Sequence, residues 1–177
     1  VAAKRLGLKD GSETVVQILK TYNGAHGKLS IARVLRGSLK DGATLYRRDS
    51  ADARIGGMFA LKGADQSKVG EAKAGDTVAL GRLEGVQTGE TLASAKIALP
   101  NVAIEELPVV YGFAIETTDR KDEVKLTSAI HKLQEEDRSL HFEQNAELQQ
   151  MALAGQGEIH LKVAVEKLAS KYGLKIT

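Results

Sequence analysis

The stretch that most constrains the fold is residues 153–161 (LAGQGEIHL), in which an apolar strand meets a Gly-x-Gly turn and a helix begins on the far side. Gly155 and Gly157 allow the backbone to turn where a side chain would clash. Glu158 falls in the first helical turn, where its negative charge meets the positive end of the helix dipole. We therefore expect a strand–turn–helix corner with a small domain built around it.

Three functions compete for this corner. A strand, a glycine-rich turn and a helix together can bind phosphate through free N–H groups, but the dinucleotide fingerprint requires a third glycine where this chain has His160. Glu158 and His160 could form a metal or acid–base site, although residues two apart on a helix do not face each other. The default is a structural turn that also serves as a docking edge.

Composition and charge limit the partners. The chain of 177 residues contains no cysteine, so it has neither disulfides nor thiolate metal sites. No segment approaches the roughly 20 apolar residues of a membrane span. Residues 1–99 carry 16 Lys and Arg against 10 Asp and Glu, whereas residues 100–177 carry 9 against 13. We expect a cytoplasmic protein with one basic domain and one acidic domain, no membrane partner and no metal.

The distribution of glycine and proline predicts two domains. Fourteen of the 18 glycines precede residue 93, and both prolines, Pro100 and Pro108, flank one short segment. Residues 1–12 are expected to be a linker, 13–93 an all-β small barrel, 94–108 a second linker, and 109–177 an α+β domain.

Short apolar runs separated by glycine turns predict the barrel. We expect strands at residues 14–19, 28–35, 44–46, 53–61 and 77–80. Residues 24–30 (GAHGKLS) have a superficial likeness to a P-loop. We reject a P-loop because only two residues separate the glycines, Leu29 follows the lysine, and the segment lies between two strands.

Residues 109–177 follow the order β-α-β-β-α-β, which predicts a ferredoxin-like sandwich. A strand at 109–117 precedes a helix that is capped by Asp119 and buries Leu126, Ala129, Ile130 and Leu133 on one face. The acidic run at residues 135–137 is either a solvated surface, which we favour, or a ledge for a basic partner. A last strand begins at Leu174 and is cut short.

The second helix is apolar on two sides, with Leu161, Val165, Leu168 and Tyr172 on one side and Ile159 and Val163 on the other. Such a helix is usually buried on both sides. We expect Ile159 and Val163 to be exposed in this chain and covered by domains outside it.

Five segments together resemble a known family. Residues 34–45 (VLRGSLKDGATL), 74–79 (AGDTVA) and 88–92 (TGETL) resemble the barrel signature of translational GTPases. Residues 133–137 (LQEED) and 154–161 (AGQGEIHL) resemble the third domain of elongation factor G. The chain is similar to domains II and III of an elongation factor G-like protein, with Arg138 where the family usually has proline and Lys162 where it usually has an acid. These departures suggest a divergent paralogue.

The resemblance implies a function. A GTPase domain, with GTP and Mg²⁺, belongs to the parent protein, and this fragment has no GxxxxGK[ST], DxxG or NKxD motif, so we expect no enzymatic activity and no cofactor in it. The fragment would be a monomeric, ribosome-binding central portion that couples GTP hydrolysis to movement of tRNA and mRNA. Its partners would be small-subunit rRNA, a ribosomal protein, and the parent's GTPase and C-terminal domains.

The candidate site residues form two groups. The basic balance of the barrel suggests contacts to rRNA phosphates, for which the candidates are Arg36, Arg47, Arg48 and Arg54. The candidates for docking to the ribosome or to other domains are Gly155, Gly157, Glu158, Ile159, His160 and Val163. Two alternatives stay open: another translational GTPase of the ribosomal-protection or release type, and a stand-alone nucleotide-binding module at residues 155–157.

Overall fold

Two hydrophobic cores organise the chain, one in each of two compact units, Val1–Ile104 and Glu105–Thr177. The computed structural model describes residues 11–24, 27–49, 51–63, 65–99, 107–117, 120–145 and 150–176. Most of the two predicted linkers lies outside these ranges. Each unit is described by itself below.

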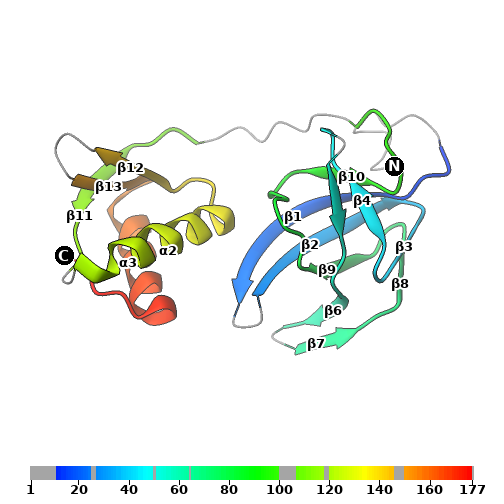
Figure 1. Ribbon diagram of the computed structural model, residues 1–177, viewed down its shortest axis with the longest axis horizontal. Coiled ribbons are helices and arrows are strands. Elements are labelled where there is room, and N and C mark those ends of the chain that lie inside the picture. The colour runs from blue at the N-terminus through cyan, green and yellow to red at the C-terminus, as the bar shows by residue number, and fades with distance from the viewer. Residues whose placement is uncertain are drawn as a thin grey trace. The chain divides into compact units, whose positions relative to one another are not determined.

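The first unit is built from short antiparallel strands (Figure 1). They are β1 (Val15–Gly24), β2 (Gly27–Arg36), β3 (Ser38–Lys40), β4 (Thr44–Tyr46), β5 (Asp52–Arg54), β6 (Met58–Lys62), β7 (Asp65–Lys68), β8 (Glu71–Lys73), β9 (Thr77–Gly81) and β10 (Thr91–Ala93). Eight of them form one sheet in the order β5-β4-β10-β1-β2-β9-β6-β7, and β3 pairs with β8. The predicted small barrel is confirmed.

The barrel core is aliphatic and receives side chains from strands at both ends of the sheet order. Its fully buried members include Ile18, Leu39, Leu45, Met58 and Leu80. Because successive residues of a strand point to opposite faces, β2 buries Ser30, Ala32 and Val34 and leaves Leu29 and Ile31 half-buried outside. The sheet therefore wraps one closed core.

Two glycines interrupt the long strand that we predicted at residues 53–61. Gly57 has φ +144°, which favours glycine, and the N–H of Gly56 donates to the carbonyl of Gly81 at 2.9 Å. The chain therefore passes from β5, which pairs with β4, to β6, which pairs with β9. The prediction of one strand was wrong because the chain changes its pairing partner here.

The segment with a superficial likeness to a P-loop joins β1 to β2 as an antiparallel hairpin, with Gly24 paired to Gly27. Residues 25 and 26 lie outside the described residues. A P-loop must lead from a strand into a helix, so the hairpin agrees with our rejection of that motif.

The barrel unit continues past residue 93, where we predicted its end. The N–H of Ser94 donates to the carbonyl of Thr14 at 2.9 Å. Leu99 is buried in a small cluster with Val15 and Ala93. Residues 94–99 thus pack on the start of the first strand, a contact that we did not predict because the segment carries no strand pattern and adjoins the proline-flanked segment.

The second unit has the predicted β-α-β-β-α-β order (Figure 1). Its elements are β11 (Tyr111–Ile115), the 3-10 turn η1 (Arg120–Asp122), α2 (Glu123–Glu136), β12 (His141–Asn145), β13 (Gln150–Gly155) and α3 (Glu158–Tyr172). The sheet order is β11-β13-β12, and Ile176 forms an antiparallel bridge with Thr117 beside β11. This is the ferredoxin-like arrangement, with both helices on one face of the sheet.

The structure confirms the buried stripe of α2 in full and that of α3 in part. Leu126, Ala129, Ile130 and Leu133 are the buried residues of α2. On α3 the buried residues are Leu161, Ala164 and Leu168, while the predicted Val165 and Tyr172 are half-buried. Gly173 caps α3 with φ +68°, where its N–H bonds the carbonyl of Ala169.

The start of α2 differs from the prediction. The cap position is Asp122, whose side chain makes no capping hydrogen bond. Asp119, the predicted cap, lies outside the described residues.

We predict that Leu126→Ala lowers the free energy of unfolding of the second unit by about 2 to 5 kcal/mol, because it leaves a cavity in a core where Leu126 is fully buried. Val124→Ala is the matched control, since Val124 lies on the same helix and is 82% exposed; it should change stability by no more than about 0.5 kcal/mol. Urea denaturation followed by helical circular dichroism measures both. Equal losses would show that α2 does not use this face for its core.

Candidate functional site

The turn between β13 and α3 needs its two glycines for different reasons. A Cβ at Gly155 would lie 2.6 Å from Nδ1 of His160 and 3.0 Å from Cδ2 of Leu161. Gly157 faces open space, but its φ of +156° is one that side chains rarely adopt. Gly155 therefore permits a close approach of two elements, and Gly157 permits the backbone path.

The His160 side chain occupies the space that Gly155 leaves. The backbone N–H of Gln156 donates to Nδ1 of His160 at 3.1 Å. Since this N–H can only donate, Nδ1 must be the unprotonated nitrogen. Nε2 then carries the proton and donates to Oδ2 of Asp137 at 3.0 Å. The imidazole thus bridges the start of α3 to the end of α2.

Asp137 is held by two further hydrogen bonds, because both the N–H and the hydroxyl of Ser139 donate to its Oδ1. Burial raises the pKa of Asp137, but the hydrogen bonds from Ser139 and His160 outweigh this, so the pKa lies below its ordinary value of 3.8. The carboxylate is therefore ionised at neutral pH and orients the imidazole.

The turn also holds the segment that enters the second unit. The side-chain amide of Gln156 donates to the carbonyl of Pro108 at 2.8 Å. The N–H of Val110 donates to the carbonyl of Gly155 at 3.0 Å. One corner, which we call the His160 corner (Asp137, Gly155, Gln156, Gly157 and His160), therefore joins both helices and the entering chain.

This geometry favours the structural function of the corner over a phosphate cradle. The N–H of Gln156 is used by His160, and the N–H of Leu161 bonds the carbonyl of Gly157 at 3.2 Å. Glu158 adds a negative charge at the helix start and pairs with Lys162 at 2.6 Å. An incoming phosphate would find the N–H of Gln156 already used and would meet the carboxylate of Glu158.

The second unit exposes an apolar surface on the other side of α3. Ile159 is 72% and Val163 43% exposed, as we expected for this chain. The two side chains lie four residues apart on one side of the helix, where they are neighbours. We call Ile159 and Val163 the α3 apolar surface.

The acidic run at residues 135–137 is neither a free ledge nor a fully solvated surface. Asp137 bonds His160, and Glu136 pairs with Lys171 at 2.6 Å and is nearly buried. Two of the three acids thus hold α2 to α3. We missed this function because the partners lie 23 and 35 positions along the chain.

The four candidate arginines divide into two pairs. Arg36 bonds Glu13 at 3.2 Å, and Arg47 binds both carboxylate oxygens of Glu90 at 3.0 and 3.1 Å. Arg48 and Arg54 are exposed, and no ion pair to either is found within the described ranges. Arg36 and Arg47 are therefore occupied within the barrel, while Arg48 and Arg54 are available to a partner.

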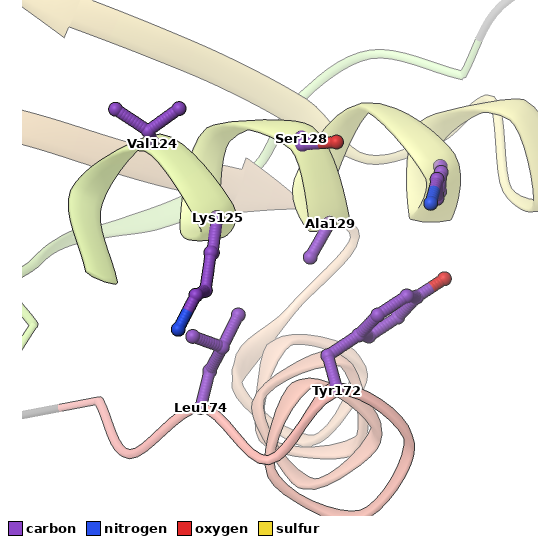
Figure 2. Close-up of a pocket in the computed structure, with 7 residues that line it drawn as sticks. Val124, Lys125, Ser128, Ala129, Tyr172 and Leu174 are labelled. Atoms are coloured by element: carbon purple, nitrogen blue, oxygen red, sulfur yellow. The ribbon is translucent and has the colours of Figure 1, made fainter. Parts of the chain in front are cut away.

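A groove of about 400 Å³ lies between α2 and the C-terminal end of α3. Figure 2 shows Lys125 and Ala129 projecting from α2 toward Leu174 and Tyr172. On α3 the groove lies at the end of the helix opposite His160, whereas on α2 its lining extends along the helix as far as Lys132. It is a separate surface feature that the sequence did not suggest.

In the part of the chain that the structure describes, no three or more His, Asp or Glu side chains gather in a way that could hold a metal ion. None of the helices in that part is both long and apolar enough to cross a membrane.

We predict that Gly155→Ala destabilises the second unit by about 1 to 3 kcal/mol, because the added methyl group overlaps the His160 ring. Combining it with His160→Ala should recover at least about 0.5 kcal/mol of the loss, since the closest atoms are then gone. Gly70→Ala is the control because a Cβ there meets no atom within 4 Å. Additive urea-denaturation losses would contradict the proposed overlap.

We predict a pH dependence for the same corner. Because the pKa of Asp137 is lower in the folded state than its ordinary 3.8, ionised Asp137 stabilises the fold above pH 3.8, and this contribution is lost as the pH falls through the lowered pKa. The difference in urea midpoint between the wild type and Asp137→Asn should be constant near neutral pH and shrink in acid. Glu143→Gln, at an exposed acid, is the control. A difference that grew in acid would reverse the sign we assign.

Comparison with known proteins identifies both units. The family model described as elongation factor G domain 2 matches residues 12–95, and that described as elongation factor G, domain III matches residues 108–177. A protein of Thermus thermophilus known from its crystal structure superposes with a TM-score of 0.80 and 29% identity, over 99% of this chain and 26% of that one.

Curated relatives match nearly the whole chain. An elongation factor G-like protein of Synechocystis sp. is 48% identical over 98% of this chain and 25% of its own length. Elongation factor G 1 of Geobacter sulfurreducens is 31% identical over 96% of the chain and 27% of its length. The chain thus spans about a quarter of the relatives it matches. With both matches in order along the sequence, the chain belongs to the elongation factor G family, of which it carries the second and third domains.

Proposed function

We propose that this chain is the ribosome-docking central portion of a cytoplasmic, elongation factor G-like protein. It would couple GTP hydrolysis in a GTPase domain outside this chain to movement of tRNA and mRNA. The observation that carries the proposal is the order of the two family matches, residues 12–95 and then 108–177. GTP and Mg²⁺ would be bound by the GTPase domain, and the chain itself would bind as a monomer.

The barrel supports a contact with rRNA. Phosphate backbones attract basic surfaces without reading their sequence. Arg48 and Arg54 offer exposed guanidinium groups, whereas the groups of Arg36 and Arg47 are held by carboxylates. We therefore assign the rRNA contact to Arg48 and Arg54 and a structural function to Arg36 and Arg47.

The second unit supports a contact with protein. The α3 apolar surface carries two large exposed side chains on the first turns of the helix, Ile159 and Val163. Contiguous exposed apolar residues are typical of protein interfaces. We assign this surface to a ribosomal protein or to a further domain of the parent, with the His160 corner holding α3 in position behind it.

We predict that the chain co-sediments with 70S ribosomes at low salt and dissociates as salt rises. A combined Arg48→Ala and Arg54→Ala variant should bind about tenfold more weakly, because it loses charge-assisted bonds to phosphate. Arg36→Ala is the control: it should lower the unfolding midpoint of the barrel, because Glu13 loses its partner, and affect binding less.

Two results would contradict this proposal. One is the absence of co-sedimentation of the folded wild-type chain at low salt. The other is micromolar binding of GTP or NAD by the chain alone, which would favour a nucleotide-binding module at residues 155–157.

A further inference from the structure

Arg82 has an unusual backbone conformation. Its φ of +58° is the only positive value of a non-glycine residue among the described residues. Residues other than glycine avoid this region because their Cβ crowds the following carbonyl oxygen. Two hydrogen bonds hold the conformation, from the N–H of Arg82 to the carbonyl of Lys28 at 3.2 Å and from the N–H of Glu84 to the carbonyl of Arg82 at 3.1 Å.

The Arg82 stem lies on bare backbone at Gly56. A Cβ at Gly56 would lie 2.8 Å from both Cβ and Cδ of Arg82 and 3.0 Å from its Cγ. Only glycine at position 56 therefore lets the stem lie flat against the β5–β6 connection. The positive φ of Arg82 and the lack of a side chain at Gly56 together direct the guanidinium along this surface.

Arg54 projects from the same surface. Ile55 is buried in the barrel core, whereas its neighbours Arg54, the last residue of β5, and Gly56, in the bend that follows, are both exposed. Because a chain spans at most about 3.6 Å per residue, the Cα atoms of Arg54 and Gly56 lie within roughly 7 Å of each other. Arg82, which covers Gly56, is therefore a close neighbour of Arg54, although 28 positions separate them in the sequence.

Neither guanidinium is neutralised in the barrel. Both residues are exposed, and within the described ranges no carboxylate pairs with Arg54 or Arg82. Arg36 and Arg47, by contrast, each bind a glutamate. Two like charges held close together on a stiff strand and a strained turn repel each other unless an anion lies between them.

We propose that Arg54 and Arg82 form a two-arginine site for an RNA phosphate. The inference rests on the proposed ribosome-binding function and adds Arg82 to it. A guanidinium presents a planar fork of donors that matches phosphate oxygens, and its hydrogen bonds to phosphate are charge-assisted. Strained residues persist where the surrounding structure enforces them, which is common at binding sites. Arg82 acts by direct contact with the phosphate, and Gly56 by positioning the Arg82 stem.

The first test compares Arg82→Met with Arg33→Met in binding to 70S ribosomes. Both changes remove one exposed arginine charge of the barrel and keep a linear stem, but the guanidinium of Arg33 donates to Thr77 at 3.0 Å. Arg82→Met should bind about tenfold more weakly and lower the slope of log affinity against log salt by about 0.7 to 0.9. Arg33→Met should change either quantity less. Thermal melting checks that both variants fold, and Arg82→Gln is a second neutral variant.

The second test separates RNA from an acidic protein surface. The chain has no cysteine, so Glu84→Cys provides a unique attachment point for an iron chelate two residues from Arg82. Hydroxyl radicals generated there should cleave the rRNA backbone when the labelled chain is bound to 70S ribosomes.

The outcomes are distinct. Weaker binding of Arg82→Met than of Arg33→Met, together with rRNA cleavage from position 84, supports the two-arginine site. Equal binding of the two variants by ribosomes that bind the wild type overturns this inference and leaves the proposed function standing. Weaker binding without rRNA cleavage also overturns it, in favour of an acidic protein contact. No binding of the wild type removes the proposed function and the site together.

Discussion

The close approach of the His160 imidazole to the backbone at Gly155 determines how the second unit is assembled. The ring fits where a Cβ would be, accepts a hydrogen bond from Gln156 and donates one to Asp137. Because Asp137 ends α2 and His160 lies in the first turn of α3, this contact sets one helix against the other. The core leucines then pack between helices whose ends are already positioned.

Ion pairing also divides the arginines of the barrel into two groups: those bound to a glutamate within the barrel and those open to a partner. A basic balance in the first half of the sequence is a property of composition, but Arg36 and Arg47 are neutralised by glutamates 23 and 43 positions away. Arg54 and Arg82 have no carboxylate partner among the described residues, and the hydrogen bond from Gly56 to Gly81 brings the Arg82 stem onto Gly56, two residues from Arg54. Net charge therefore says which unit is the more basic, while ion pairing says which of its charged side chains stay open to a partner.

Helix α3 uses its two apolar sides differently. Leu161, Ala164 and Leu168 close the core over the sheet, whereas Ile159 and Val163 remain exposed on the α3 apolar surface. The buried side belongs to the core of the unit, whereas Ile159 is 72% exposed. Large apolar side chains that stay exposed next to one another are typical of protein interfaces.

The sequence by itself determined the fold class of each unit. Short apolar segments separated by glycines, and the order β-α-β-β-α-β, both follow from local conformational preferences. It also determined the buried stripe of α2 and the glycine cap of α3, which depend on residues a few positions apart. The tertiary structure decided the partner change at Gly56 and Gly57, the pairing of Asp137 with His160, and the placement of the Arg82 stem on Gly56. These contacts join residues 23 or more positions apart, and no local pattern specifies them, because their geometry exists only once the strands and helices have packed.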